Sequence, residues 1–427
     1  MIKFRLPFLI LLTAFCVLPC RADLPTLTVL HTFGLGGPGD LTPSHNANSG
    51  GARPEATLVQ GPDGMLYGTT SDGGTHGTGV IFKIGAEGAG YTVLHSFDAL
   101  EALFTNDTNL DGGWPIGRLA FGTDNALYGV ASQGGPGGSG TIFKLKTDGS
   151  DFTILHSFEP KHELYRNSGG ASPLGLTLGP KGALFGVAKL GGSGRGLIFT
   201  LTQNGKNFHV LHSFDSVDQN GNANDGGAMP AAAVIFGRDD VLYGTANVGG
   251  RGGNGVIYKM DADGRHFTVL HDFQRKTKDN GVFPGDSLTL GADNFLYGCT
   301  RQGGASDGGI VYKISADGTA FAVLHTFSDP NSSNADGTLP AGPLVFGTDE
   351  CLYGVSGGGG ETGSGTLFKM TADGAKFFTL HDFSSAEGGY ARAGLTPGHD
   401  GNLYGVSTNG GANKTGTLFR VTFAAAK

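Results

Sequence analysis

The sequence predicts an all-β protein folded as a single seven-bladed β-propeller, and three repeated elements carry this prediction. A Leu-aromatic-Gly element occurs seven times along the 427 residues. Gly-x-x-Phe or Gly-x-x-Tyr, and Leu-His-x-Phe, each recur seven times with it. Sequence periods of roughly fifty residues are typical of propellers and other repeat arrays. The aromatic residues of the first element are Tyr67, Tyr128, Phe185, Tyr243, Tyr297, Tyr353 and Tyr404.

The spacing between these elements is almost invariant. The first aromatic residue precedes the second by 15 residues in six repeats and by 14 in the third. The second precedes the Phe of Leu-His-x-Phe by 15 residues in all six repeats that contain both. Fixed spacing indicates a rigid supersecondary unit rather than a flexible array.

Each unit is predicted to contain four antiparallel strands. In the first repeat these cover residues 56–59, 65–68, 79–84 and 91–97. Aromatic and β-branched residues favour strands, and the Asp-Gly pairs between them favour tight hairpin turns.

The order of the elements predicts how the ring closes. The repeat region begins with a lone fourth strand, Leu27 to Phe33, and its last unit stops after a third strand near Phe423. The N-terminal strand is therefore expected to complete the last blade. Such closure leaves no exposed sheet edge.

The repeat resembles a known bacterial family. The segments that carry the resemblance are Asp111-Gly-Gly-Trp-Pro115, Leu127-Tyr-Gly-Val130, Gly140-Thr-Ile-Phe-Lys144 and Ile154-Leu-His-Ser-Phe158. They are similar to the GloVer tandem repeats of exported "choice-of-anchor" proteins, and the similarity extends over residues 23–427. This resemblance implies a surface or secreted protein. It implies no particular activity, substrate or catalytic residue.

The N-terminus has the features of a secretory signal peptide. Lys3 and Arg5 precede an apolar run from Leu6 to Leu18, and Cys20-Arg21-Ala22 provides small residues for cleavage. We expect cleavage after Ala22, which divides the chain into a signal peptide of residues 1–22 and a propeller of residues 23–427. The predicted location is periplasmic or extracellular.

Charge and hydropathy narrow the classes of partner. Without Lys3, Arg5 and Arg21, the 29 basic residues become 26 against 37 acidic residues, a net charge of −11. This balance argues against nucleic acid as a partner. No later segment is apolar enough to span a membrane, and we expect a monomer. Cys299 and Cys351 could form a disulfide in an exported protein or could simply be small buried residues.

Loop lengths indicate one face of the ring as a binding face. The connections from each fourth-strand Phe to the next Leu-aromatic vary from 21 to 34 residues, whereas the turns on the other face are short. Insertions concentrated on one face often mark a binding surface. Drift in tolerant loops would give the same pattern, so both interpretations stay open.

A turn made of Gly, one or two residues and Pro precedes the predicted inner strand in six repeats, and Ala391 replaces the proline in the seventh. The residue before this position varies, and a ring of such side chains near the channel mouth would suit a sugar or peptide. Packing between neighbouring loops is the alternative. Lys189 and Arg301, which end second strands, could meet an anionic ligand or simply be solvated. The predicted binding residues before the proline position are Arg53, Trp114, Met229, Phe283, Leu339 and Tyr390, with Ser172 at the same place.

One segment resembles half of a calcium loop. Asp107, Asn109 and Asp111, followed by Gly112, fit the start of an EF-hand loop, but Arg118 stands where the closing Glu is expected. An Asx turn explains the same residues without metal. No cofactor is otherwise indicated, and calcium is a secondary prediction.

The predicted function is recognition of an extracellular small-molecule, glycan or protein ligand, without catalysis. One His per repeat is better explained as a structural hydrogen bonder than as a catalytic group. A carbohydrate-active enzyme, either glycosidase or lyase, and a structural envelope or matrix protein remain open alternatives. The enzyme would require paired carboxylates, and the loop acids considered for it are Glu101, Glu159, Glu163, Glu361 and Glu387.

Overall fold

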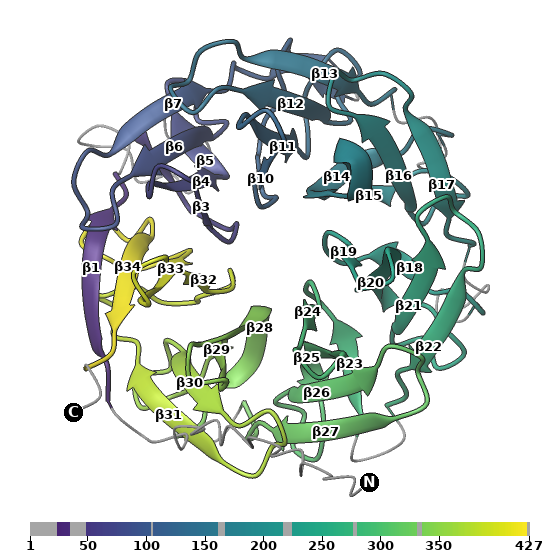
Figure 1. Cartoon of the computed structure of the whole chain (residues 1–427). Coiled ribbons are helices and arrows are strands. Elements are labelled where there is room, and N and C mark those ends of the chain that lie inside the picture. The colour runs from purple at the N-terminus through teal and green to yellow at the C-terminus, as the bar shows by residue number, and fades with distance from the viewer. Residues whose placement is uncertain are drawn as a thin grey trace, which may run out of the picture.

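The protein is a closed ring of β-sheets. The computed structural model describes residues 24–34, 48–103, 106–160, 167–216, 224–275, 280–330 and 335–424. Seven sheets stand like blades around a central axis, with their first strands inside and their fourth strands outside (Figure 1). The predicted seven-bladed propeller is confirmed. The predicted signal peptide, residues 1–22, lies outside the described residues.

The first three blades are four-stranded antiparallel sheets listed from the inside outward. Blade 1 consists of β3 (Val59–Gln60), β4 (Leu66–Thr70), β6 (Val80–Ile84) and β7 (Thr92–Ser96). Blade 2 consists of β10 (Ala120–Phe121), β11 (Leu127–Ala131), β12 (Thr141–Leu145) and β13 (Thr153–Ser157). Blade 3 consists of β14 (Ala171–Leu178), β15 (Ala183–Leu190), β16 (Leu197–Thr202) and β17 (His209–Ser213).

In blades 4 and 5 the inner strand is split into two pieces that pair with the same neighbour. Blade 4 consists of β18 (Ala228–Pro230), β19 (Ile235–Phe236), β20 (Val241–Val248), β21 (Val256–Asp261) and β22 (Thr268–Asp272). Blade 5 consists of β23 (Gly281–Pro284), β24 (Thr289–Leu290), β25 (Phe295–Gly303), β26 (Ile310–Ser315) and β27 (Phe321–Thr326).

Blade 6 consists of β28 (Thr338–Phe346), β29 (Leu352–Gly358), β30 (Thr366–Met370) and β31 (Phe377–Asp382). Blade 7 consists of β32 (Thr396–Pro397), β33 (Leu403–Ser407), β34 (Thr417–Thr422) and the N-terminal β1 (Thr26–Thr32). β1 pairs antiparallel with β34 from Thr26 opposite Thr422 to Thr32 opposite Thr417. The predicted closure by the N-terminal strand is therefore confirmed.

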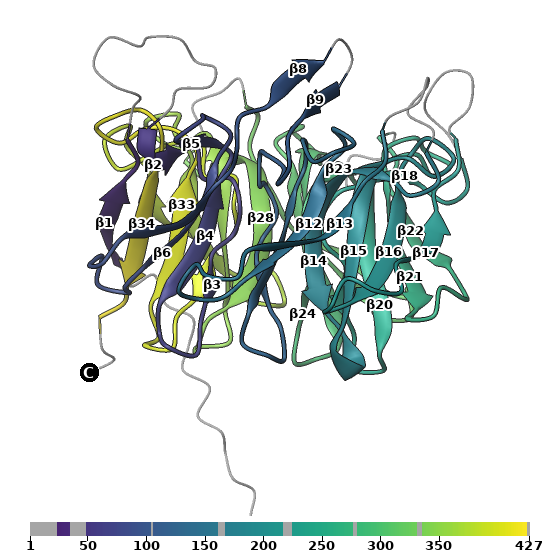
Figure 2. The same cartoon turned by 90° about the horizontal axis from the view of Figure 1, so that it is seen from above.

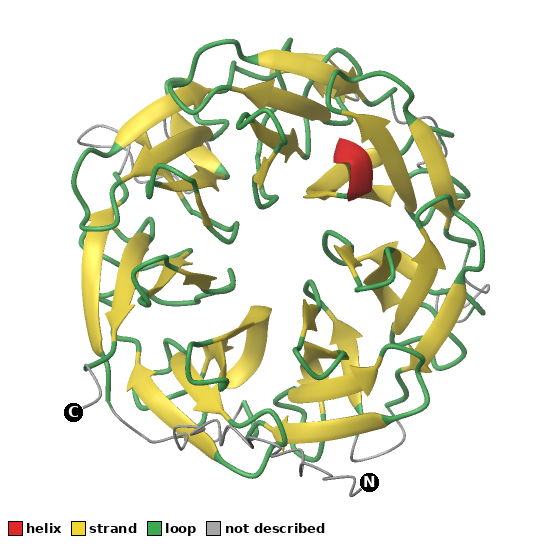
Figure 3. Ribbon diagram, in the orientation of Figure 1, coloured by secondary structure: helices red, strands yellow, loops and turns green. Residues whose placement is uncertain are grey.

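Two short strand pairs lie outside the blades. They are β2 (Asn48–Ala52) with β5 (Asp72–Gly74), and β8 (Glu101–Leu103) with β9 (Asn106–Thr108). β8 and β9 rise above one face of the ring, which we call the upper face (Figure 2). Strands and loops make up nearly all of the ring, and blade 3 contains the single 3-10 turn η2 (Pro180–Gly182) among the described residues (Figure 3). The described part contains no helix long and apolar enough to cross a bilayer.

The Leu-aromatic-Gly element builds the core between neighbouring blades. Tyr67 is fully buried and its hydroxyl donates to Asp63 in the preceding turn at 2.6 Å. A Cβ on Gly68 would come within 2.6 Å of the Phe82 ring, so the third-strand aromatic residue requires this glycine. Cys299 and Cys351 are buried in neighbouring blades and are not joined by a disulfide.

The fourth-strand histidines join the outer edges of adjacent blades. His156 stacks on Phe208 of the next blade, with ring centroids 3.9 Å apart and the rings nearly parallel. Five more of these histidines stack in the same way on an aromatic residue of the following blade. This geometry agrees with the structural interpretation of the repeated His.

Candidate ligand channel

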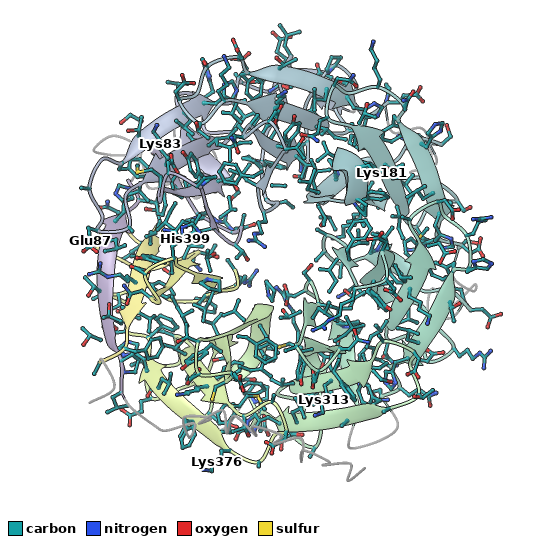
Figure 4. The ribbon with its side chains drawn as sticks, in the orientation of Figure 1. Lys83, Glu87, Lys181, Lys313, Lys376 and His399 are labelled. Atoms are coloured by element: carbon teal, nitrogen blue, oxygen red, sulfur yellow. The ribbon has the colours of Figure 1, made fainter. Side chains whose placement is uncertain are left out.

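The inner strands surround an open channel along the ring axis. Its volume is 700 Å³, which falls in the range of small-molecule sites. The side chains leave the centre of the ring open in Figure 4, where the labelled Lys181 and His399 lie on turns between first and second strands. The wall consists mainly of small and apolar residues that follow the Gly-x-Pro turns, such as Ala231, Ala232 and Ala233 of blade 4.

Five ionisable side chains interrupt this wall. They come from four blades and all line the same cavity. The five residues are Glu55 of blade 1, Arg118 of blade 2, Asp286 and Arg301 of blade 5, and Arg392 of blade 7.

Glu55 is surrounded by guanidinium groups. Arg53 lies 3.6 Å from its carboxylate and also approaches Asp72 at 3.4 Å. Burial raises the pKa of Glu55, while the charges of Arg53, Arg392 and Arg301 act in the opposite direction. Positively charged guanidinium groups therefore act on the Glu55 carboxylate.

Asp286 is held where a carboxylate is poorly solvated. Its Oδ2 is buried without a hydrogen-bond partner among the described residues, although the residue as a whole keeps some exposure. Burial raises the pKa of Asp286, against the charge of Arg301 and a backbone hydrogen bond from Gly342. The side chain of Arg301 passes over Gly285, since a Cβ there would lie 3.2 Å from the arginine Nε. Because Gly285 has no side chain, the Arg301 side chain can extend across it toward the channel.

Arg118 differs from the other four charged residues. Its side chain is exposed to the channel, although burial of its guanidinium among wall atoms lowers the pKa of that group. No described residue accepts a hydrogen bond from Arg118 or forms an ion pair with it. The nearby wall of blade 3 is formed by Leu174, Gly175 and Leu176.

Below this charged zone the channel wall is mostly apolar and carries no ionisable side chain among the described residues. The lower residues belong to the ends of the inner strands, close to the first-to-second-strand turns, on the face opposite β8 and β9 (Figure 2). The channel thus has a charged upper part and an apolar lower part. The lower wall includes Ile235, Phe236, Leu290, Val345, Phe346 and Pro397.

The residues before the proline position form a ring, as the sequence indicates, and they share an unusual backbone. All seven have positive φ, between 53° and 59°. The N–H of each donates to a carbonyl of the preceding blade, as Trp114 does to Thr78 at 2.8 Å. Trp114, Met229, Phe283 and Leu339 are half-buried, whereas Arg53 is exposed and Tyr390 is 47% exposed. The position has a structural function in every blade, and ligand binding by these side chains stays a prediction.

The two predicted cationic residues are placed differently. Arg301 lines the channel, and Lys189 is exposed at the end of β15. Of the predicted binding set, Arg53 lies beside Glu55, and Arg301 lines the same channel as Glu55.

The oxygens of the calcium-like segment have protein partners. Asp111 lies 2.8 Å from His95 Nε2 and accepts from the Asp98 N–H, and Asn109 Oδ1 accepts from the Gly112 N–H. The Asp107 side chain lies outside the described part of the structure. In that described part, no three His, Cys, Asp or Glu side chains are grouped to hold a metal.

Among the loop acids, Glu101, Glu159 and Glu361 are exposed, and Glu163 lies outside the described residues. Glu387 accepts hydrogen bonds from the N–H and hydroxyl of Ser384 and lies 3.2 Å from His381. The two carboxyl groups that share the channel, Glu55 and Asp286, are not in this predicted set.

Comparison with known proteins decides the family. The model described as the Gloeobacter/Verrucomicrobia repeat matches residues 37–227 and 230–427. The chain belongs to this family. The match confirms the predicted resemblance to the bacterial GloVer repeats. No curated protein matches the chain in sequence.

Solved structures resemble this Gloeobacter/Verrucomicrobia repeat protein in fold. A streptogramin B lyase has a TM-score of 0.55 at 15% identity, covering 95% of this chain and all of the other. Virginiamycin B lyase from Staphylococcus aureus has a TM-score of 0.53 at 15% identity, covering 89% and 98%. The extracellular domain of a B. thetaiotaomicron protein described as a hybrid two-component system has 0.53 at 10%, covering 87% and 39%. These identities establish the propeller fold alone.

Sequence reasoning missed most of the channel charges in this repeat protein. Glu55, Arg118, Asp286 and Arg392 each occur within three residues after the proline position, where other blades carry uncharged residues. The signal that could have identified them is a charged residue in the strand that a propeller buries around its axis. Aligning the repeats on their proline position would have brought all four into view.

Proposed function

We propose that the protein is a non-catalytic extracellular recognition propeller that binds a small ligand in its central channel. The observation that carries the proposal is the convergence of five ionisable side chains from four blades on one cavity of 700 Å³. Binding sites combine a largely apolar wall with a few convergent polar groups. The extracellular location rests on the signal-peptide features of residues 1–22.

The wall itself supports binding. Ala231, Ala232 and Ala233 keep blade 4 thin on the side that faces the channel. A ring with a purely structural function would gain stability from larger apolar side chains at these positions, because burying apolar surface is favourable. Small residues here instead preserve an open space.

A glycan array on the protein without residues 1–22, followed by calorimetry on each hit, tests this proposal. Ala232→Trp would place an indole in the channel, and binding of true channel ligands should be lost. Ala375→Trp adds the same side chain on an exposed turn outside the channel and should leave binding unchanged. Ligands that bind parent and Ala232→Trp equally would remove the channel from the binding site.

A carbohydrate-active enzyme is the second candidate, because one observation favours it. Glu55 and Asp286 both line the channel, and burial raises the pKa of each. Carboxyl groups with raised pKa values are typical of general acids. Incubating each array hit with parent protein and with Glu55→Gln, and analysing products by mass spectrometry, tests for glycosidase or lyase turnover. Product formation by the parent that Glu55→Gln abolishes would replace the recognition proposal.

A further inference from the structure

The channel charges do not balance, and Arg118 is the channel arginine on which no described acid acts. Three arginines face two acids across the same cavity, which leaves one positive charge when both acids are ionised. Arg53, Arg392 and Arg301 act on Glu55, and Arg301 acts on Asp286. Arg118 has no acidic neighbour of this kind among the described residues.

Arg118 also has unused hydrogen-bonding capacity. A guanidinium carries five N–H donors in a planar fork, and none of those of Arg118 meets an acceptor in the described structure. Its side chain is not shielded by protein, because it remains accessible from the channel. A cation with accessible donors attracts an anion, and a neighbouring low-dielectric wall strengthens that attraction.

The surplus of a single charge limits the anion. A dianion such as a phosphate monoester would overcompensate that single surplus charge, whereas a monoanion would neutralise it. A carboxylate carries one negative charge, and its two oxygens match the arginine fork in bidentate geometry.

The lower channel indicates the chemistry of the ligand body that carries the carboxylate. Ile235, Phe236, Leu290 and Phe346 offer aliphatic and aromatic surface without ionisable groups. Such a wall favours an alkyl chain or an aromatic ring over a polyhydroxylated sugar, because apolar burial is its main source of affinity. We infer that the channel ligand is an apolar monocarboxylate that pairs with Arg118 and extends its apolar body into the lower channel.

This inference rests on the proposed channel function and names its ligand class. Octanoate and benzoate are the probes, octanol and benzyl alcohol their neutral counterparts, and glucuronate the sugar carboxylate. Titration calorimetry and saturation-transfer NMR should detect octanoate or benzoate binding to the parent, at least tenfold tighter than the matching alcohol. Arg118→Gln should weaken carboxylate binding by about tenfold or more, the contribution expected of a hydrogen bond between charged groups.

Arg251→Gln is the matched control, since it removes the same charge from a side chain that is 80% exposed outside the channel. It should bind octanoate like the parent. Absence of carboxylate binding, equal binding to Arg118→Gln, or binding of glucuronate alone would each overturn the inference. None of these outcomes removes the proposed function, which fails only if array ligands bind Ala232→Trp as they bind the parent.

Discussion

Pro115 packs directly against Gly79 of the preceding blade. A Cβ on Gly79 would lie 2.7 Å from the proline Cδ and 2.3 Å from the Thr70 carbonyl oxygen, and Gly79 has φ +102°. The neighbouring Trp114 N–H donates across the same boundary. The two recurring sequence features, Gly-x-x-aromatic and Gly-x-Pro, are therefore the two sides of one contact between blades. The same contact joins Gly140 to Pro173, Gly196 to Pro230, Gly255 to Pro284, Gly309 to Pro340 and Gly416 to Pro54.

Gly79→Ala is expected to be strongly destabilising. The variant combines an unfavourable φ with two close contacts, and we expect a loss of roughly 3 kcal/mol in the free energy of unfolding. Gly64→Ala is the control, because Gly64 has φ +79° and nothing lies within 4 Å of a Cβ there. It should cost about 1 kcal/mol, the backbone contribution alone. Calorimetric melts compare the two, and equal losses would refute the packing argument.

Ala391→Pro is expected to stabilise the protein. Ala391 occupies the position of the six packed prolines, and Tyr390 before it has the same φ of 54° as its counterparts. The Ala391 N–H donates to no described residue, so proline removes no hydrogen bond. We expect a gain of about 0.4–1 kcal/mol, seen as a higher melting temperature. Ala393→Pro, two residues further along the chain, is the comparison, and a stabilisation no larger than its effect would count against the prediction.

Removal of the N-terminal strand tests the ring closure. Without residues 23–34, the outer edge of β34 would lose its partner β1 and present unpaired N–H and C=O groups. We expect the shortened protein to melt many degrees lower or to aggregate, as measured by calorimetry and light scattering. Adding a synthetic peptide of residues 24–34 should restore part of the loss. Coincident melts of full and shortened protein would contradict this closure.

The fold could be predicted from sequence because it repeats. Each element occurs seven times at fixed spacing. The same strands and turns are therefore predicted seven times, and an assignment that is ambiguous in one repeat is settled by the others. The closure followed from the order of the elements, with a fourth strand first and a third strand last. The contact between Gly79 and Pro115 could not be predicted, because it joins two repeats and depends on a backbone conformation that composition does not reveal.

The channel was less predictable because its charges do not repeat. Each of Glu55, Arg118, Asp286 and Arg392 occurs in one blade only, and they meet through ring closure rather than through sequence proximity. Ligand binding is predicted for the residues before the proline position because their side chains vary from repeat to repeat. Their shared positive φ indicates that backbone geometry constrains that position, while its side chains are freer to change.

The histidine stacks predict a dependence of stability on pH. Burial lowers the pKa of His31, His156, His212 and His271 below the ordinary value of 6.5. The unfolded chain therefore takes up protons first, so stability is present above about pH 6.5 and is lost as the pH falls. The raised pKa values of Glu55 and Asp286 have the opposite effect, because these two acids favour the folded state as the pH falls.

Melting temperatures should accordingly drop between pH 7.5 and pH 5.5. His156→Phe with His212→Phe keeps aromatic stacking on Phe208 and Phe267 but removes two of the titrating groups. This double variant should show a smaller drop than the parent over the same interval. An unchanged drop would mean that other groups control the acid lability.

Asp286→Asn should separate stability from ligand binding. The Asp286 carboxylate has a buried Oδ2 without a partner among the described residues, and its raised pKa means that ionisation disfavours the folded state. The amide removes that charge with little change in volume, and we expect a gain on the order of 1 kcal/mol in the free energy of unfolding at pH 8.

The effect of Asp286→Asn should depend on pH. For an acid with a raised folded-state pKa, the destabilisation is present at high pH and fades as the pH falls and the carboxyl is protonated. The advantage of Asp286→Asn over the parent should therefore shrink toward pH 5, as followed by melts across that range. Thr289→Val, a nearly isosteric change in the nearby strand β24, should show no such pH-dependent difference. A variant that gains stability at high pH while losing affinity for channel ligands would mean that the carboxylate is kept at this position for binding, at a cost to the stability of the fold.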